Sequence, residues 1–590
     1  MAVDLRAFLA DLERRGQLVR VPVEVDPDQE IAVIHHRVIA AGGPALLFER
    51  VTGSPYRVVT NLFGTPQRVA LACGRSPAEA GERLARVVTR LMPPSLKGMW
   101  AARSDLRHLL PARLRTVGQG PVLESVQEPA DLMRLPVLTC WPQDGGPFFT
   151  LPLVHTADPV TGQGNLGIYR LQRFDSRSTG MHWQIEKGGG FHFDLAARRD
   201  RALPVSVVLG GPPALTIAAV APLPEGIDER ILAAYLMGHP LDVIRRPSGH
   251  RVPARAEFVI EGAVHPGDTR REGPFGDHFG HYSAAADYPV LRVERVLARK
   301  DAIYPATVVG KPVQEDYFIG EALQEIALPI LRMVKPAVID IWAYPETGFH
   351  PLAVMAVRER YPREALKLAL GMLGEGQVSL TKVMITVNEG TAVRDFAAVS
   401  AALWRHLTPE GIFLLSPTAQ DTLDFTGPAM NTGSRLLLIA TAHPDRAPRS
   451  TPPPPPNPGA PLHPRLGPAV ACGPACLLVQ AGDALGDPEV LVSELSRHPV
   501  AGAYLFIVLV SPDIPLQDAV LRLWGWFTRF DPAADLYPAG RRVRGNRLLF
   551  DFPLLIDARW KKGYPRPVAF DPAVSRKVDE RWSAYRIAGC

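Results

Sequence analysis

The chain has 590 residues, which is enough for about three or four domains. It is 46% hydrophobic and 21% charged, so it can bury large cores, and this composition excludes a disordered protein. Its 65 basic and 60 acidic residues leave a net charge of only +5 without a long basic block, which argues against a nucleic-acid-binding protein.

The cysteines and the hydrophobic segments favour a cytoplasmic protein. Few, scattered cysteines, odd in number, are typical of a reducing compartment, and the C-x3-C pair has no second Cys/His pair nearby to complete a zinc site. The N-terminus MAVDLRAFLADLERRG lacks a signal-peptide core. The uncharged run 202–223 is long enough to span a membrane, but its prolines and Gly-Gly pair favour two buried strands joined by a turn. The cysteines are Cys73, Cys140, Cys472, Cys476 and Cys590.

The predicted elements change in character along the chain. Asp4 caps an amphipathic helix that ends near Gly16, and strands and helices alternate to about residue 110. From about 120 to 300, runs such as VSVVL, LTIAAV, EFVIEGAV and VLRVERVLA predict an antiparallel, barrel-like β region. From about 319 to 440, helices alternate with strands again, as in an α/β layer. We find no internal repeat.

A proline-rich stretch, RAPRSTPPPPPNPGAPLHP, then interrupts the pattern at about 446–464 and predicts a semi-rigid excursion. A hydrophobic strand, AYLFIVLV, and a terminal helix within SRKVDERWSAYRI follow it.

Four polar segments are candidates for a functional site. In the first, Gly162-x-Gly164-x-x-Gly167 has the spacing of a dinucleotide-binding turn, which must follow a buried strand and open a helix. Here the residues after it, Ile-Tyr-Arg-Leu-Gln-Arg-Phe, predict a strand, which disfavours the dinucleotide interpretation.

The second and third segments each allow a functional and an ordinary interpretation. In His182-Trp-Gln-Ile-Glu-Lys-Gly-Gly-Gly190, backbone N–H groups and Lys187 could hold a phosphate, or the segment could be a surface hairpin. In Pro222-Leu-Pro-Glu-Gly-Ile-Asp-Glu229, the acidic residues precede a helix, where carboxylates commonly serve as caps.

The fourth segment is Arg271-Glu-Gly-Pro-Phe-Gly-Asp-His278, in which Glu272 and Asp277 flank a turn and can converge. A bridging arginine would hold one carboxylate ionised, while a drier pocket would raise the pKa of the other, as a general acid requires. Two solvated turn carboxylates are the alternative. His278 and His281 could suggest a metal site, but this spacing outside a helix is a weak signal for one.

Taken together, these segments resemble the UbiD family of prenylated-FMN-dependent decarboxylases. The similarity extends over nearly the whole chain. It rests on DLRAFLADLERRGQLVRV, VVTNLFGTPQRVA, NLGIYRLQ, MHWQIEKGGG, APLPEGIDE, VPARAEFVIEG, EGPFGDHFGHY and IDARWKKGYPRP.

The resemblance implies an α/β (α+β) fold of three domains. Residues 1–112 would form an N-terminal α/β domain, and 113–318 a central split β-barrel like that of flavin reductases, with the cofactor and metal site. Residues 319–590, with the proline-rich insertion, would form a C-terminal α/β domain that mediates a homodimer or a larger homo-oligomer.

The resemblance also assigns site residues. Asn165 and Glu229 would bind Mn²⁺ or Mg²⁺, hard cations that prefer oxygen ligands. Glu186 would be the third residue of the metal site, at a position where the family usually has histidine; its negative charge would favour a hard cation and alter binding of a monovalent cation (K⁺ or Na⁺) nearby. Because strand alternation would send Asn165 and Arg170 to opposite faces, a turn or bulge near Gly167 is expected. The flavin-binding residues would be Ile168, Tyr169, Arg170, His182, Trp183, Gln184, Lys187, Gly188 and Lys382.

By the same resemblance, the chain is expected to decarboxylate an aromatic or α,β-unsaturated acid without oxidation. Loss of CO₂ from an sp² carbon leaves a carbanion that no ordinary side chain stabilises, so the modified flavin would supply the electron sink. Arg170 would orient the substrate carboxylate within a network with Glu272, and Asp277 would deliver the proton.

The phrase LDFTGPAMNTGSRLLLIAT looks like the longer menaquinone-biosynthesis branch, which favours a prenylated dihydroxynaphthoate-type acid. A 4-hydroxy-3-polyprenylbenzoate of ubiquinone biosynthesis is the second candidate, and a small aryl or cinnamic-type acid is the third. A flavin prenyltransferase would supply the cofactor, and a prenylated substrate would favour peripheral contact with a membrane.

Two alternatives from other classes remain open. A flavin-binding oxidoreductase could use the same split barrel, but hydride transfer would not need the Glu272/Asp277 pair. A non-catalytic scaffold on this fold is opposed by the intact set Asn165, Arg170, Glu229, Glu272 and Asp277.

Overall fold

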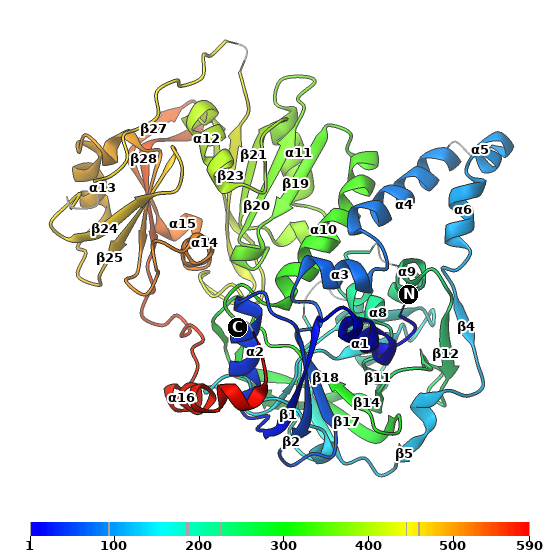
Figure 1. The fold of residues 1–590 in the computed structure, drawn as a ribbon. Coiled ribbons are helices and arrows are strands. Elements are labelled where there is room, and N and C mark those ends of the chain that lie inside the picture. Colours follow the sequence, from blue (N-terminus) through cyan, green and yellow to red (C-terminus); the bar gives the residue numbers. More distant parts are fainter. Residues whose placement is uncertain are drawn as a thin grey trace. The chain divides into compact units, whose positions relative to one another are not determined.

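The computed structural model describes residues 2–92, 95–184, 188–223, 226–443, 445–457 and 461–588. The chain divides into two compact units, Met1–Ile330 with Arg566–Cys590, and Leu331–Pro565. Figure 1 labels their helices and strands, and each unit is described by itself.

The first unit begins with the predicted amphipathic helix. The Asp4 carboxylate accepts a hydrogen bond from the backbone N–H of Ala7 and so caps α1 (Leu5–Arg14), whose apolar face is buried. A four-stranded sheet follows in the order β1-β2-β3-β18. Its strands are β1 (Leu18–Val25), β2 (Ala45–Val51), β3 (Arg57–Thr60) and β18 (Ile303–Pro305), and the helices of this region are α2 (Glu30–Ala40), α3 (Pro66–Ala72), α4 (Pro77–Leu91), α5 (Leu96–Ala101) and α6 (Arg103–Leu109).

The centre of the first unit is an antiparallel sheet in the order β10-β17-β14-β11-β7-β8, with β5 paired to β17. Alternate residues of β11 face two different cores: Val208 faces one, and Val207 and Leu209 face the other. Among the described residues no ladder joins β8 to β10, so this sheet is open. Its strands are β5 (Ser125–Gln127), β7 (Leu153–Ala157), β8 (Gly164–Ile168), β10 (Ser178–Gly180), β11 (Leu203–Leu209), β14 (Phe258–Glu272) and β17 (Ala286–Ala298).

Smaller elements complete the first unit. The terminal segment belongs to it, because Arg37 of α2 hydrogen-bonds to Ser575 of α16 (Pro572–Arg581) at 3.0 Å. The other elements are β4 (Leu114–Thr116), β6 (Phe148–Phe149), β9 (Leu171–Gln172), β12 (Leu241–Arg245), β13 (Arg251–Pro253), β15 (Phe275–Gly276), β16 (Tyr282–Ser283), α7 (Gly188–Ala197), α8 (Pro213–Ala219), α9 (Glu229–Met237) and α10 (Glu315–Val334), the last of which continues into the second unit.

The prediction of two buried strands in the uncharged run 202–223 is correct for only one half of the run. Its first half is the strand β11, but its second half is the buried helix α8, with Pro213 in its first turn. A short apolar run that is buried on all sides has no periodicity that separates strand from helix, which is why the prediction of a second strand was wrong.

The second unit contains two five-stranded sheets. The first has the order β19-β20-β21-β23-β22 and the second the order β24-β25-β26-β28-β27. The strands are β19 (Val338–Ala343), β20 (Leu352–Val357), β21 (Val383–Asn388), β22 (Ile412–Ala419), β23 (Thr432–Ala440), β24 (Leu466–Ala471), β25 (Cys476–Ala481), β26 (Phe506–Val510), β27 (Leu536–Arg544) and β28 (Arg547–Ala558), and the helices are α11 (Glu364–Met372), α12 (Phe396–His406), α13 (Pro488–Ser496), α14 (Ala519–Phe527) and α15 (Pro532–Asp535).

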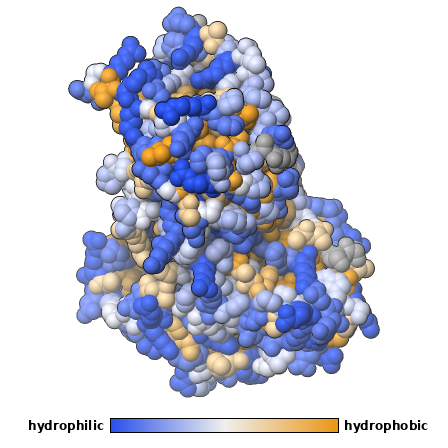
Figure 2. Space-filling view, turned by 90° about the vertical axis from the view of Figure 1, so that its left-hand side faces the viewer, coloured by the Kyte–Doolittle hydropathy of each residue, from blue (hydrophilic) through white to orange (hydrophobic). Residues whose placement is uncertain are grey.

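The mixed α/β fold class is therefore confirmed. Within the described residues, no helix has both the length and the hydropathy needed to cross a membrane. On the face that Figure 2 shows, hydrophobic side chains lie in small groups between hydrophilic ones.

Candidate active site

A break between two short strands brings the first predicted segment into the site. β8 pairs regularly with β7 from Gly164 to Ile168, and the chain then leaves this sheet and pairs through β9 with β6. The irregularity that Asn165 and Arg170 require therefore falls at Tyr169 and Arg170, just after the expected position. It sends Arg170 away from the β7–β8 ladder.

Arg170 joins the two carboxylates that sequence reasoning paired. Its Nε donates to Glu272 Oε1 at 3.3 Å, and its Nη1 donates to Asp277 Oδ2. Its Nη2 donates to Ser283 Oγ at 3.0 Å, and the guanidinium lies over the ring of Phe275. Because all three charged side chains are nearly inaccessible to solvent, their interactions are much stronger than those of exposed pairs.

His182 extends this network on the other side of Glu272. Its Nδ1 lies 3.1 Å from Glu272 Oε1, and its ring packs on that of Tyr288 at 4.2 Å between centroids. Burial, together with the charge of Arg170, lowers the pKa of His182, so the imidazole is neutral at pH 7. Its Nε2 is buried and has no hydrogen-bond partner among the described residues.

The position of Glu272 depends on a glycine. A Cβ atom on Gly180 would stand 2.3 Å from Glu272 Oε2, so any other residue there would displace the carboxylate. Glu272 Oε2 is buried and unpartnered within the described part of the chain. A buried carboxylate oxygen without a partner is costly, and it is available to a ligand.

Asp277 is the carboxylate that the arginine holds ionised. Burial by itself raises the pKa of Asp277, but Arg170 and then His278 outweigh it and hold this pKa well below its ordinary value. His278 contributes its backbone N–H at 2.8 Å and its Nδ1 at 2.9 Å, both to Asp277 Oδ1. The solvated-turn alternative for these two carboxylates is therefore excluded, since both are buried.

The turn that carries Asp277 is held by a carboxylate that the motifs did not reveal. Asp144 Oδ1 accepts from the backbone N–H of Gly276 at 2.8 Å, and Oδ2 accepts from the N–H groups of Cys140 and Trp141. Burial raises the pKa of Asp144 to about 7 against these hydrogen bonds. Sequence reasoning also missed Ser283, and only a long-range contact signal could have found either residue.

The two predicted oxygen ligands lie on neighbouring backbone. Asn165 is in β8, and the backbone N–H of the next residue, Leu166, donates to Glu229 Oε2 at 2.8 Å. Glu229 is the first residue of α9, while Asp228 is its N-cap, so the capping interpretation holds for Asp228. Burial raises the pKa of Glu229 to about 7, because the loss of solvation outweighs the hydrogen bond from Leu166 and the charge of Arg230.

Glycines at the end of the second segment let backbone approach these side chains. A Cβ on Gly188 would stand 2.2 Å from Asn165 Oδ1, and one on Gly189 would stand 2.5 Å from the ring of Trp183. The N–H of Gly189 donates to the Tyr169 hydroxyl at 3.0 Å, and burial raises the pKa of that hydroxyl to about 12. The N-terminal turn of α7 is therefore packed against the predicted ligand and flavin residues.

The remaining predicted residues fall into three groups. Ile168 packs on the core, and Gln184 has its carbonyl next to Gly190. Glu186 and Lys187 lie outside the described residues. Lys382 is in the second unit, where its Nζ forms a buried ion pair with Asp424 at 2.9 Å.

The structure thus brings the predicted residues of the first unit together in two adjoining clusters. One is Arg170, His182, Glu272 and Asp277; the other is Asn165, Tyr169, Trp183, Gly188 and Glu229. They meet at the sequence neighbours Tyr169–Arg170 and His182–Trp183. The described residues include no group of three or more His, Cys, Asp or Glu side chains that could hold a metal by themselves.

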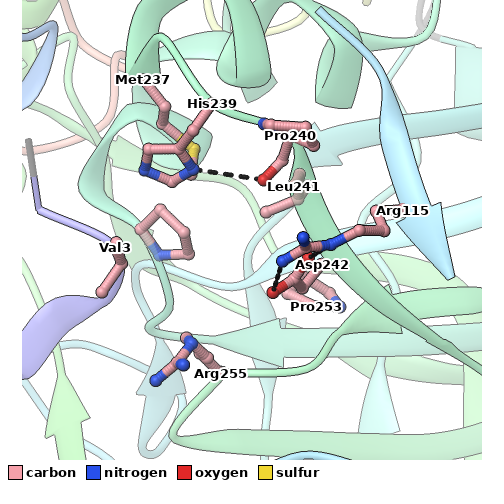
Figure 3. A pocket seen from close by; sticks show the side chains of 10 residues that line it. Val3, Arg115, Met237, His239, Pro240, Leu241, Asp242, Pro253 and Arg255 are labelled. Atoms are coloured by element: carbon pink, nitrogen blue, oxygen red, sulfur yellow. Dashed lines mark hydrogen bonds and ion pairs between the residues drawn. The ribbon is translucent and has the colours of Figure 1, made fainter. Parts of the chain in front are cut away.

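A separate cavity of about 280 Å³ lies beside β12 and β13. Figure 3 shows His239 and Asp242 at its edge, with Arg115 paired to Asp242. None of its lining residues belongs to either cluster.

Comparisons with known proteins agree on one family. Models of the 3-octaprenyl-4-hydroxybenzoate carboxy-lyase match in three parts: the N-terminal domain at 9–88, the Rift-related domain at 115–312 and the C-terminal domain at 317–440. A Chlamydia pneumoniae protein that is named as one of the subunits of a 4-hydroxybenzoate decarboxylase is 40% identical over 585 residues, which is 98% of each chain.

Two solved structures have the same fold. The vanillic acid decarboxylase of Sedimentibacter hydroxybenzoicus, in closed form, is 26% identical with a TM-score of 0.69, and the match covers 76% of this chain and 95% of that one. An evolved dimeric form of the UbiD-class enzyme HmfF from Pelotomaculum thermopropionicum, in complex with prFMN, is 28% identical with a TM-score of 0.63, covering 76% and 97%.

Proposed function

The chain belongs to the UbiD family of carboxy-lyases, and on that basis we propose that it removes CO₂ from an aromatic carboxylic acid without oxidation, using prenylated FMN. The observation that carries the proposal is the buried bridge from Glu272 through Arg170 to Asp277. When bound, the modified flavin would supply the electron sink that the chain lacks.

The first cluster suits the handling of a carboxylate and a proton. Arg170 has the planar donor set that binds a carboxylate in a bidentate manner, and Glu272 and Ser283 orient it. A substrate carboxylate would compete with Asp277 for this guanidinium. Burial, which is the largest influence on Asp277, would then raise its pKa, so Asp277 would take up a proton and could later deliver it.

The second cluster suits a flavin phosphate and a cation. Asn165 and Glu229 present oxygen atoms next to the glycine-rich start of α7, and a Mn²⁺ or Mg²⁺ ion would stabilise the ionised form of Glu229, which burial disfavours. Tyr169 and Trp183 offer aromatic surface to the flavin, and His182 Nε2, which has no partner in the part of the chain that the structure describes, offers a polar atom. The other roles are proposed from the family resemblance alone. They are flavin binding by Ile168, Gln184, Lys187 and Lys382, and a place for Glu186 in the metal site near a K⁺ or Na⁺ ion.

For the substrate, we propose a prenylated dihydroxynaphthoate-type acid of menaquinone biosynthesis, on the strength of the segment LDFTGPAMNTGSRLLLIAT. A small hydroxyaryl acid is the second candidate, because the names of two similar proteins refer to 4-hydroxybenzoate and vanillic acid. A polyprenylated 4-hydroxybenzoate, the second candidate from the sequence, becomes the third. A flavin prenyltransferase would provide the cofactor.

The test is to produce the protein with and without a flavin prenyltransferase and to measure CO₂ release from one acid of each class. We expect release only from protein whose bound flavin is heavier than FMN, and only with one class of acid. Decarboxylation by flavin-free protein, or oxidation of a reduced nicotinamide without CO₂ release, would contradict the proposal; the second result would identify a flavin oxidoreductase.

A further inference from the structure

The two sheets of the second unit have the same topology. In copy A, residues 338–440, the ladder β19-β20-β21-β23-β22 is antiparallel, parallel, parallel and antiparallel. In copy B, residues 466–558, the ladder β24-β25-β26-β28-β27 has the same sequence of directions. In both copies a helix follows the second strand, and another, α12 or α14, follows the third; in copy B the short helix α15 comes after α14.

The register of the strands is also the same. Leu352 pairs with Val383, which pairs with Leu436, and in copy B Cys476 pairs with Phe506, which pairs with Leu554. Both edge ladders of each copy are irregular, and the irregularities occur on the same two ladders. Copy B is therefore a structural duplicate of copy A, although the sequence shows no repeat.

Equivalent faces of the two copies are buried against each other. One shared core contains the same positions from both sheets, while the opposite faces pack separately against α11 in copy A and α13 in copy B. The equivalent helices α12 and α14 also contribute to the shared core. The equivalent pairs in this core include Leu352 and Cys476, Val383 and Phe506, and Leu436 and Leu554.

This is the arrangement of a two-fold dimer within one chain. In such an interface each partner contributes the same surface patch. The sheet face of copy A is apolar across its central strands. Without copy B this face would be an exposed apolar patch, and a patch of that kind needs a partner.

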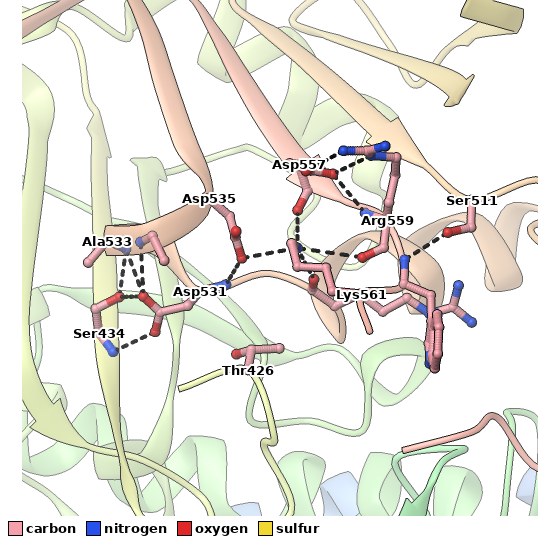
Figure 4. A network of polar contacts seen from close by, with 12 residues as sticks. Thr426, Ser434, Ser511, Asp531, Ala533, Asp535, Asp557, Arg559 and Lys561 are labelled. Atoms are coloured by element: carbon pink, nitrogen blue, oxygen red, sulfur yellow. Dashed lines mark hydrogen bonds and ion pairs between the residues drawn. The ribbon is translucent and has the colours of Figure 1, made fainter. Parts of the chain in front are cut away.

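Polar contacts connect the copies at the edge of the core. Ser434 of β23 donates through its hydroxyl to Asp531 Oδ1 at 2.7 Å, and Asp531 Oδ2 accepts from the backbone N–H of Ser434 at 3.0 Å. The N–H of Ala533, in the first turn of α15, donates to Ser434 Oγ. Figure 4 shows these contacts next to the Asp535–Lys561 pair.

The proline-rich stretch is the tether between the copies, and it is fastened to both. Arg449 donates to the carbonyl oxygens of Trp404 and Leu407 at the end of α12, and its guanidinium lies 5.6 Å from the ring centroid of Phe552 in β28. The Tyr504 hydroxyl of copy B donates to the carbonyl of Pro454. A tether of this kind raises the effective concentration of copy B near copy A, and so favours pairing within one chain.

Copy B has kept the fold but, among its described residues, has no counterpart of the buried Lys382 or of the connection that holds its partner Asp424. Leu505 stands at the position of the buried Lys382: the carbonyls of both accept from the following strand, at Leu554 and Leu436. The long connection 420–431, which holds Asp424, is replaced in copy B by the turn at Gly545 and Asn546.

We propose that copy B is a built-in partner. It occupies, within the same chain, the face of copy A that a single-copy chain would use to bind a second copy of itself. Full-length chains therefore do not associate through this face, and any self-association uses another surface.

A new disulfide can decide whether the copies pair within one chain. The Ser400 hydroxyl of α12 accepts from the backbone N–H of Ala475 at 2.9 Å and is within hydrogen-bonding reach of the Cys476 thiol. In full-length protein that carries Ser400→Cys and Cys472→Ser, we expect oxidation to form a disulfide between Cys476 and the new thiol at position 400 of the same chain. Denaturing, non-reducing mass spectrometry should show a single-chain mass that lacks two hydrogens. The matched control adds Cys476→Ser and should stay unlinked.

A product of two linked chains would overturn the proposal, and so would the absence of a link in folded protein. If the cysteine variant does not fold, protease sites inserted between Ser450 and Thr451 and between Lys562 and Gly563 serve instead, since all four residues are exposed. After both cuts we expect copy B to stay bound in native mass spectrometry. Its release would overturn the proposal, and protein cut at one site only is the control.

Discussion

Asp277→Asn tests whether Asp277, the carboxylate paired with Arg170, delivers the proton. The substitution keeps the size of the side chain and an oxygen for the His278 N–H, which lies at 2.8 Å. It removes the negative charge that faces Arg170, and an amide cannot supply the proton. Flavin occupancy should stay near the wild-type level, because Asp277 contacts Arg170 but none of Asn165, Gly188 and Glu229, which are proposed to hold the phosphate and the cation.

The expected loss follows from the role. General acid catalysis contributes about 10²–10⁴-fold, which corresponds to about 3–5 kcal/mol of transition-state stabilisation. Single-turnover CO₂ release should fall by this factor, measured beside bound-flavin absorbance on the same sample. The matched control is Ser283→Ala, which removes an uncharged acceptor of the same guanidinium but leaves the proton donor in place, and which should cost about 1.5 kcal/mol, or about tenfold. Near-normal CO₂ release from Asp277→Asn would refute the reasoning and place the acid elsewhere.

Three further predictions concern the same site. Glu229→Gln should lose divalent cation and most of the flavin together, by elemental analysis and absorbance; retained stoichiometric Mn²⁺ or Mg²⁺ would move the cation site elsewhere. Gly180→Ala should displace Glu272 and sharply reduce turnover, whereas Gly118→Ala, with open space around its Cβ, should not; equal activity of the two would contradict the close approach at Gly180. The depressed pKa of Asp277 should stabilise the fold above the ordinary aspartate pKa of 3.8, and this stability should disappear as pH falls below that value. The melting-temperature gap between wild type and Asp277→Asn should therefore narrow between about pH 5 and 3, and a gap independent of pH would contradict the shift.

The different roles proposed for Glu272 and Asp277 depend on the tertiary structure. Glu272 and Asp277 could be picked out from the sequence because a turn brings neighbours together. Their connection to Arg170, 102 and 107 residues away, depends on the β8 strand breaking at Tyr169 and on the sheet that holds both segments. Asp277 is held ionised because the distant Arg170 and the neighbouring His278 together outweigh burial, and neither the burial nor the position of Arg170 is set locally.

The duplication in the second unit shows the opposite limit. Buried parallel strands are runs of interchangeable aliphatic residues, so two copies can diverge until no sequence repeat remains while their hydrogen-bond ladders stay in register. The helix α8 was misread for a related reason, since an apolar segment buried on all sides has no polar face to reveal its period.

The sequence by itself determined the family, the order of the polar segments, the capped first helix and the residue types of the site, because local patterns and ordered motifs carry that information. Only the tertiary structure decided that Arg170 bridges Glu272 and Asp277, that Asp144 holds their turn, and that the chain contains a second copy of its own C-terminal sheet. These features arise where distant segments exclude water from one another, and the strength of a charge or the partner of an apolar face is set there.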